Sequence, residues 1–154
     1  MLDRFERFTF SIFEISRCWH KLASDVMSKY DLKGPYAIYL IVMRRFPLGV
    51  TAAQLCEICN RDKADVSRAV ALMEEKGLVI RKEGLTRYRA LLKLTAAGKS
   101  AADDIARSAH IAVDRAGKGV SDEDHEIFYR ALDAIKEKMQ QLCREGIPDD
   151  YPDE

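Results

Sequence analysis

The sequence predicts a mainly α-helical protein of the α+β class, with one small hairpin among long helices. Apolar residues recur at spacings of three and four along most of the chain, which is the period of amphipathic helices. Two short strand-like runs, separated by a turn, follow each other between residues 78 and 94. A chain of 154 residues is long enough to form one domain with a buried core.

Residues 51–95 contain two short helices followed by the hairpin. Thr51 and Gln54 form the capping-box pattern that satisfies backbone N–H groups at the start of the first helix. Asp62 is placed to cap the second helix, and Gly77 stands where a left-handed residue would end it. One face of the second helix carries an apolar stripe: Val66, Ala69, Val70 and Met73. Helix, turn, helix and hairpin are together the layout of a winged helix–turn–helix.

The exposed side of the second helix is predicted to contact DNA, because the second helix of this layout enters the major groove. Arg68 can make a bidentate contact with guanine, Ser67 can reach a base or a phosphate, and Asp65 can accept from cytosine N4. An arginine at the tip of the hairpin can insert into a minor groove. The basic candidates in the helix and the hairpin are Lys63, Arg68, Arg81, Arg87 and Arg89.

Three runs in this region resemble the MarR family of bacterial transcription regulators: Asp62–Arg68, Leu72–Val79 and Leu94–Gly98. The resemblance extends roughly from Asp3 to Cys143 and is strongest between residues 51 and 98. It implies a homodimer that binds a palindromic operator in double-stranded DNA. It also implies a repressor of nearby genes that a small, often aromatic, ligand releases from the DNA.

The resemblance also assigns individual positions to the DNA interface. Arg87 falls where the family keeps its wing-tip arginine, and Thr86 stands where the family usually has aspartate. Ala64 and Asp65 occupy positions where the family often has serine or threonine. The turn at Glu83–Thr86 is shorter than the wing of the family.

The charge distribution agrees with a nucleic-acid partner, although the net charge is +0. Residues 61–99 contain 10 Lys or Arg against 5 Asp or Glu. Residues 100–154 contain 7 against 14, and residues 1–60 contain 8 against 6. A basic segment within an otherwise acidic or neutral chain is the charge pattern expected of a DNA-binding module.

Both ends of the chain are predicted to supply dimerisation helices. An N-terminal helix capped near Asp3 has apolar residues in a heptad-like stripe: Phe5, Phe8, Ile12, Ile15, Trp19, Leu22 and Val26. Phe10 and Phe13 lie off that stripe, so we interpret the helix as shared with a partner chain; the alternative is a core helix buried within its own chain. Thr95 and Ser121 are placed to begin two more helices.

The predicted organisation is a single domain over residues 1–154. Residues 3–30 and 95–144 form the dimerisation helices, and residues 35–94 form the winged helix–turn–helix. Residues 146–154, which are acidic and broken by proline, form a disordered tail.

The ligand site implied by the resemblance lies where the dimerisation helices meet the winged helix–turn–helix. Four residues in the right segments are candidates: Trp19, His20, Tyr36 and Tyr39. The alternative for each is an ordinary core position, because aromatic side chains on apolar helix faces are mostly buried.

The sequence predicts neither an enzyme nor a cofactor. His20, His110 and His125 have no metal-type spacing, and the chain has no glycine-rich phosphate loop. Asp103 and Asp104 are adjacent, so they point to different helix faces and are predicted to be solvated surface. No apolar run approaches the ~18 residues of a membrane span, and no secretory signal follows the first residues, which predicts a cytoplasmic protein.

Two alternatives to ligand-controlled regulation remain open. Cys56 and Cys59 form a CxxC that could sense thiol oxidants or a metal, although small buried apolar positions explain them more simply. The chain could also be a winged-helix protein-interaction module without DNA binding. Asp65, the short wing and the zero net charge make that alternative possible.

Overall fold

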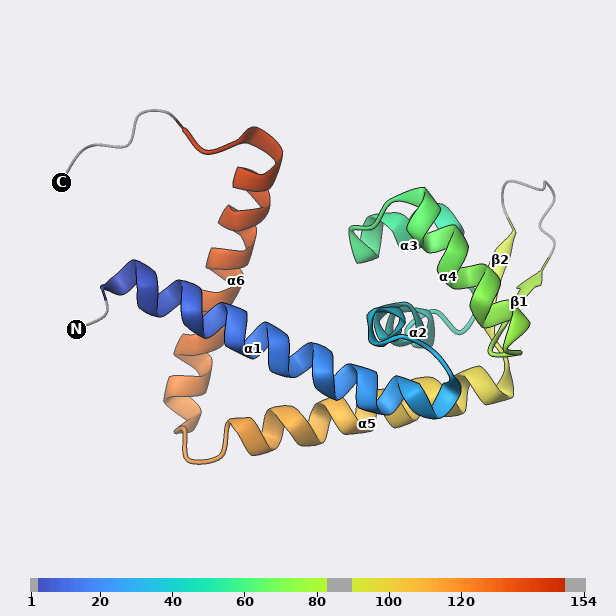
Figure 1. Cartoon of the computed structure of the whole chain (residues 1–154), viewed down its shortest axis with the longest axis horizontal. Coiled ribbons are helices and arrows are strands. Elements are labelled where there is room, and N and C mark those ends of the chain that lie inside the picture. The colour runs from blue at the N-terminus through green and yellow to red at the C-terminus, as the bar shows by residue number, and fades with distance from the viewer. Residues whose placement is uncertain (1–2, 83–89, 149–154) are drawn as a thin grey trace. The chain divides into compact units, whose positions relative to one another are not determined.

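The computed structural model describes residues 3–82 and 90–148. Its elements are α1 (Arg4–Met27), α2 (Ala37–Arg44), α3 (Ala52–Cys59), α4 (Lys63–Glu75), β1 (Val79–Lys82), β2 (Leu91–Leu94), α5 (Ala96–Ala116) and α6 (Asp122–Glu145) (Figure 1). The prediction of a mainly helical fold with one small hairpin is confirmed. The chain divides into two compact units, residues 1–112 and residues 113–154.

The predicted helix starts are confirmed by their capping hydrogen bonds. The backbone N–H of Gln54 donates to Thr51 Oγ1 at 3.2 Å, and the N–H of Thr51 donates to Gln54 Oε1 at 2.9 Å. Asp62 accepts from the N–H of Asp65 at 2.8 Å at the start of α4. Asp3 and Ser121 cap α1 and α6 in the same way. These bonds satisfy N–H groups that have no partner inside the helix.

The turn from α4 into the hairpin is closed by hydrogen bonds around Gly77. Gly77 has a φ of +69°, and the N–H of Leu78 donates to the carbonyl of Met73 at 2.9 Å. The hydroxyl of Thr95 donates to the carbonyl of Gly77 at 2.7 Å and accepts from the N–H of Gly98 at 3.0 Å. Thr95 therefore caps α5, as predicted, and also joins the start of α5 to the end of α4.

The hairpin pairs β1 with β2 in antiparallel register, from Val79 opposite Leu94 to Lys82 opposite Leu91. Val50 adds a third partner, because its N–H donates to the carbonyl of Leu92 at 3.0 Å and its carbonyl accepts at 2.8 Å. The sequence analysis missed this bridge, since one paired residue leaves no alternating pattern. The predicted turn at Glu83–Thr86 lies outside the described residues.

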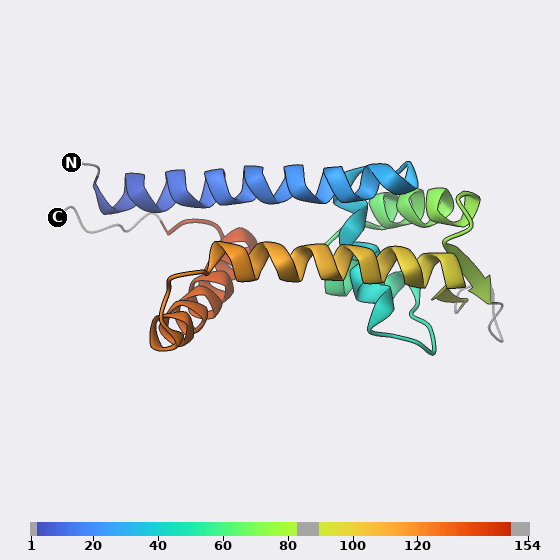
Figure 2. The same cartoon turned by 90° about the horizontal axis from the view of Figure 1, so that it is seen from below.

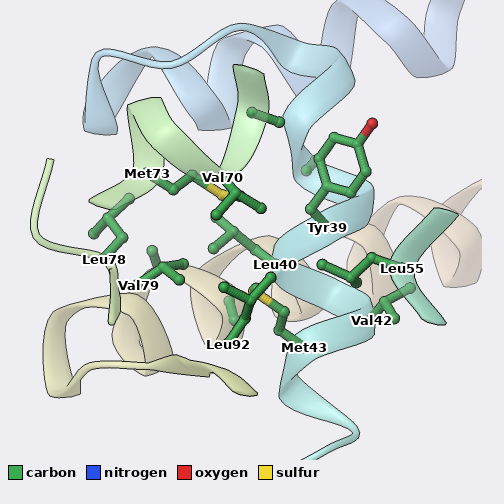
Figure 3. Close-up of a cluster of buried hydrophobic side chains, with 14 of the residues drawn as sticks. Tyr39, Leu40, Val42, Met43, Leu55, Val70, Met73, Leu78, Val79 and Leu92 are labelled. Atoms are coloured by element: carbon green, nitrogen blue, oxygen red, sulfur yellow. The ribbon is translucent and has the colours of Figure 1, made fainter. Parts of the chain in front are cut away.

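The core of residues 1–112 is centred on α2. Figure 3 shows Leu40 and Met43 of α2 among side chains of the other elements, including Leu55 of α3, Val70 of α4 and Leu92 of β2. All five side chains are at most 2% exposed. α2 contacts both α3 and β2. The helix therefore supports α3 and the hairpin from within.

Two adjacent carboxylates tie α5 to the rest of the first unit. The Nε of Arg44, at the end of α2, lies 2.5 Å from Asp103 Oδ1. Asp104 accepts from the hydroxyl of Tyr30 at 3.0 Å and lies 3.4 Å from the ammonium of Lys29. The Tyr30 hydrogen bond, followed by Lys29, lowers the pKa of Asp104 below its ordinary value despite desolvation. The two side chains diverge, as predicted, and each has a partner. Asp103 remains exposed, as predicted, whereas Asp104 is partly buried, so the solvated-surface prediction is corrected for Asp104 alone.

α1 and α5 run in opposite directions (Figure 2). α1 leaves eight large apolar side chains exposed: Phe5, Phe8, Phe10, Ile12, Phe13, Ile15, Trp19 and Leu22. α6, in the second unit, exposes Ile127, Phe128, Tyr129, Leu132, Ile135, Met139 and Leu142. In residues 3–82 and 90–148, no helix combines the length and apolar character needed to cross a membrane.

Gly98→Ala should destabilise the protein, although alanine favours an isolated helix by up to about 1 kcal/mol over glycine. A Cβ at position 98 would overlap the carbonyl oxygen of Leu78, which is backbone and cannot rotate away. We expect the free energy of unfolding in urea to fall by about 1–3 kcal/mol. The control is Ser100→Ala on the exposed side of α5, which should stay within about 0.5 kcal/mol of wild type. A stabilised Gly98→Ala variant would contradict the close approach of α5 to Leu78.

Candidate nucleic-acid interface and the adjoining cavity

The first two turns of α4 present the predicted DNA-contacting side chains to solvent. Lys63, Ala64, Ser67 and Arg68 are exposed. The opposite face is buried in the core through Val66, Ala69, Val70 and Met73. Because the Asp62 cap fixes where the helix begins, these exposed residues occupy the N-terminal end that a recognition helix offers to base edges.

Asp65 departs from the prediction that it belongs to the exposed side of α4. Its side chain is only 31% exposed, and its Oδ2 accepts a hydrogen bond from the hydroxyl of Tyr39 at 2.9 Å. The reason is that the buried Tyr39 hydroxyl needs an acceptor, which the first turn of α4 supplies. The Oδ1 atom lies 3.8 Å from Arg68 Nη2.

The Tyr39 hydroxyl is a neutral donor at physiological pH. Burial raises the pKa of Tyr39 far above its ordinary value, and the hydrogen bond to Asp65 and the charge of that carboxylate raise it further. The same contact holds α4 to α2 at a point 26 residues back along the chain.

Within the described residues, the hairpin contributes one of the predicted DNA contacts, Arg81. The guanidinium of Arg81, on β1, lies against the carboxylate of Glu74 on α4, with both N–O distances at 3.3 Å. This ion pair connects the hairpin to the C-terminal end of α4. The other three hairpin candidates, Thr86, Arg87 and Arg89, lie outside the described residues.

A cavity of about 440 Å³ adjoins α4 inside the first unit. Its walls come from α1, α2, α5 and the turn between α3 and α4, and most of the lining is apolar: Leu22, Ala23, Val26, Ala37, Ile38, Ile41, Ile105, Ala109 and Ala112. Trp19 and His20 line it, as predicted for the ligand site. Tyr36 and Tyr39 do not line it. Their rings lie 6.3 Å apart between centroids, Tyr39 in the core and Tyr36 partly buried against it.

The polar groups of the cavity are few and come from different elements. Arg61 reaches it from the turn that precedes the Asp62 cap of α4, Ser108 reaches it from α5, and Asp25, which pairs with Lys21, reaches it from α1. The ring of His20 has Nδ1 2.7 Å from the carbonyl oxygen of Ser16, so Nδ1 donates to that oxygen. The sequence analysis missed Ile38, Ile41 and Arg61 as lining residues. The sequence feature that could have identified the two isoleucines is that they lie outside the buried stripe of α2.

Cys59 also lines the cavity, whereas its CxxC partner Cys56 does not. Both thiols are free and half-buried. Burial raises the pKa of Cys59, although Arg61 opposes the shift. In residues 3–82 and 90–148 there is no group of three or more His, Cys, Asp or Glu that could hold a metal ion. A raised pKa lowers the thiolate fraction, which disfavours the thiol-sensor alternative.

Residues 30–90 match the family model described as the MarR family. The matched residues include α2, α3, α4 and β1, which have the helix, turn, helix and strand order of a winged helix–turn–helix. No sequence among the curated proteins matches the chain.

Solved structures support the same fold over nearly the whole chain. A MarR-family regulator from Listeria monocytogenes, solved with a 26mer DNA, is 23% identical with a TM-score of 0.79, covering 98% of this chain and 100% of that one. A MarR regulator from Methanosarcina mazei Go1 is 18% identical with a TM-score of 0.76, covering 89% and 99%. A MarR protein from Peptoclostridium difficile is 16% identical with a TM-score of 0.80, covering 92% and 94%.

The Cys59 thiol should react with iodoacetamide more slowly in the folded protein than in urea at the same pH. The reason is that its raised pKa and partial burial leave little accessible thiolate. Mass spectrometry of the labelled peptide gives the rate for each cysteine, and Cys59→Ser identifies the signal. Faster labelling of Cys59 in the folded state would contradict this prediction and revive the thiol-sensor alternative.

Proposed function

We propose that this protein is a homodimeric, sequence-specific DNA-binding regulator of transcription in which α4 reads the major groove. The observation that carries the proposal is the exposed N-terminal face of α4, with Lys63, Ser67 and Arg68, on a winged helix–turn–helix of the MarR family. The Listeria protein of similar fold was solved with DNA. The excess of positive charge in residues 61–99 supports a polyanionic partner.

The homodimer rests on the exposed apolar surface of α1. Phe5, Phe10, Phe13 and Ile15 are each at least 60% exposed. So many exposed large apolar side chains on one helix mark an interaction site, and a second copy of the chain would cover them. Two copies related by a two-fold axis would present two α4 helices to a palindromic operator. α6 offers a second apolar surface for the same partner.

The cavity is proposed to bind a small aromatic ligand that releases the protein from DNA. Its apolar lining suits a planar ring, and Arg61 supplies a cation for an acidic substituent. Because Arg61 directly precedes the cap of α4, a ligand there acts next to the recognition helix. Ligand and DNA would weaken each other's binding by the same factor. The protein would act as a repressor in the cytoplasm, without catalysis and without a cofactor.

The DNA proposal is tested by titrating purified protein on the DNA upstream of its own gene and on a random duplex of equal length. We expect a preference of about 10³-fold or more for the upstream duplex, with steep salt dependence. Arg68→Ala should weaken specific binding by about 10-fold or more, because a bidentate base contact is lost. Lys63→Ala should weaken binding to both duplexes alike. It should also reduce the slope of log affinity against log salt concentration by about 1.

The matched control is Lys136→Ala on α6, which removes the same charge and should leave both affinities unchanged. Equal binding of the two duplexes, or no binding to either, would overturn the regulator proposal. The winged-helix interaction module without DNA binding would then be the better assignment.

The ligand proposal is tested through Trp19, which is the single tryptophan and lines the cavity. Millimolar benzoate should change its fluorescence saturably and weaken DNA binding by about fivefold or more. Ala109→Phe fills the cavity and should abolish the response. Arg61→Gln should weaken the binding of benzoate more than the binding of benzyl alcohol, which lacks the charge. Arg107→Gln, on the exposed side of α5, should leave the binding of both compounds unchanged. An unsaturable response, or one that Ala109→Phe leaves intact, would exclude binding in the cavity.

A further inference from the structure

The carboxylate of Asp65 lies between a buried hydroxyl and the side chain proposed to read DNA. Its Oδ2 accepts from the Tyr39 hydroxyl at 2.9 Å, and its Oδ1 lies 3.8 Å from Arg68 Nη2. Figure 3 shows the Tyr39 hydroxyl pointing away from the apolar cluster that surrounds α2. The two oxygens of one carboxylate thus face two different partners.

The Tyr39 contact fixes the carboxylate in place. Tyr39 is 1% exposed and packed in the core, so its ring cannot follow a moving partner. A hydrogen bond from such a donor holds Asp65 in one rotamer and leaves Oδ1 directed toward Arg68. A surface aspartate without this bond would sample several rotamers.

The contact with Arg68 is suited to orienting that side chain without immobilising it. At 3.8 Å it is an ion pair and too long for a hydrogen bond. The Arg68 side chain is 68% exposed, and exposed pairs at this helical spacing are weak. Arg68 therefore remains available to a base while its guanidinium is biased toward one direction.

An acidic residue in the first turn of a helix also has a general role, because it interacts favourably with the helix dipole. That role requires neither Tyr39 nor Arg68. It predicts a loss of helix stability on substitution and no change in which base is preferred, so experiment can separate the two roles.

We propose that Asp65 is a positioning residue that determines specificity: held by Tyr39, it orients Arg68 toward guanine. This inference rests on the proposed DNA-binding function of α4. A pre-oriented guanidinium loses less conformational freedom when it makes the bidentate contact, which favours guanine over other bases. The negative charge of Asp65 also repels phosphate, which keeps binding to random DNA low.

The test uses a duplex that the purified wild-type protein selects from a pool of random DNA. Each base pair of that duplex is changed in turn, and the position at which Arg68→Ala loses discrimination is taken as the Arg68 contact. Asp65→Asn keeps the shape and an acceptor for Tyr39 but loses the charge. Asp65→Asn should lower the preference for the selected base over the other bases at that position by about tenfold. It should also raise the affinity for random duplex. Tyr39→Phe should lower discrimination at the same position in the same direction.

The double variant Asp65→Asn with Arg68→Ala should discriminate no worse than Arg68→Ala alone, since the two residues act through one contact. The control is Asp133→Asn on α6, which removes the same charge opposite a basic residue three positions later and should change nothing. Thermal unfolding checks that each variant is folded.

Three results would overturn the inference. In the first, Asp65→Asn weakens selected and random duplexes equally and lowers the melting temperature, which is the dipole role alone. In the second, its effect persists in the Arg68→Ala background at another base pair, which means that Asp65 reads that base directly. In the third, Asp65→Asn leaves the base preference at the Arg68 contact unchanged, although the wild type prefers the selected duplex. The proposed function then stands without this inference. A wild-type protein without any preference would overturn both.

Discussion

Burial of α2 is the constraint on which the rest of the first unit depends. Five of its eight residues are buried, and the helix contacts α3 and β2. Its Tyr39 also donates a hydrogen bond to Asp65 of α4. Two of its other residues, Ile38 and Ile41, line the cavity. One short helix therefore forms the centre of the core on one side and a wall of the cavity on the other. Because packed cores are dense, a ligand that displaces α2 on the cavity side would disturb the support of α4 as well.

Local interactions made much of the fold predictable from the sequence. The caps at Thr51, Asp62 and Thr95 depend on residues three positions apart, so the chain itself shows them. The left-handed turn at Gly77 is predictable for the same reason, since its requirement is a single backbone angle. The exposed face of α4 follows from helical periodicity once the cap fixes its start.

Contacts between distant segments account for what the sequence did not predict. The hydrogen bond from Tyr39 to Asp65 spans 26 positions, and the one from Tyr30 to Asp104 spans 74. Each pairs a tyrosine with an aspartate that has an ordinary surface role when considered alone. Neither residue type nor spacing identifies the partner, because tertiary packing decides it. The cavity is unpredictable for the same reason, since its lining comes from four separate segments.

The Thr95 hydroxyl has a mechanical consequence for the winged helix–turn–helix. It joins the carbonyl that ends α4 to the amide that begins α5, while Gly98 lies against the backbone of Leu78. These contacts hold the end of α4, the base of the hairpin and the start of α5 against one another. We expect a tilt of α5 to be passed to α4 through this joint. Reorientation of the reading helix is therefore an angular change set at its C-terminal end, and its amplitude grows toward Arg68.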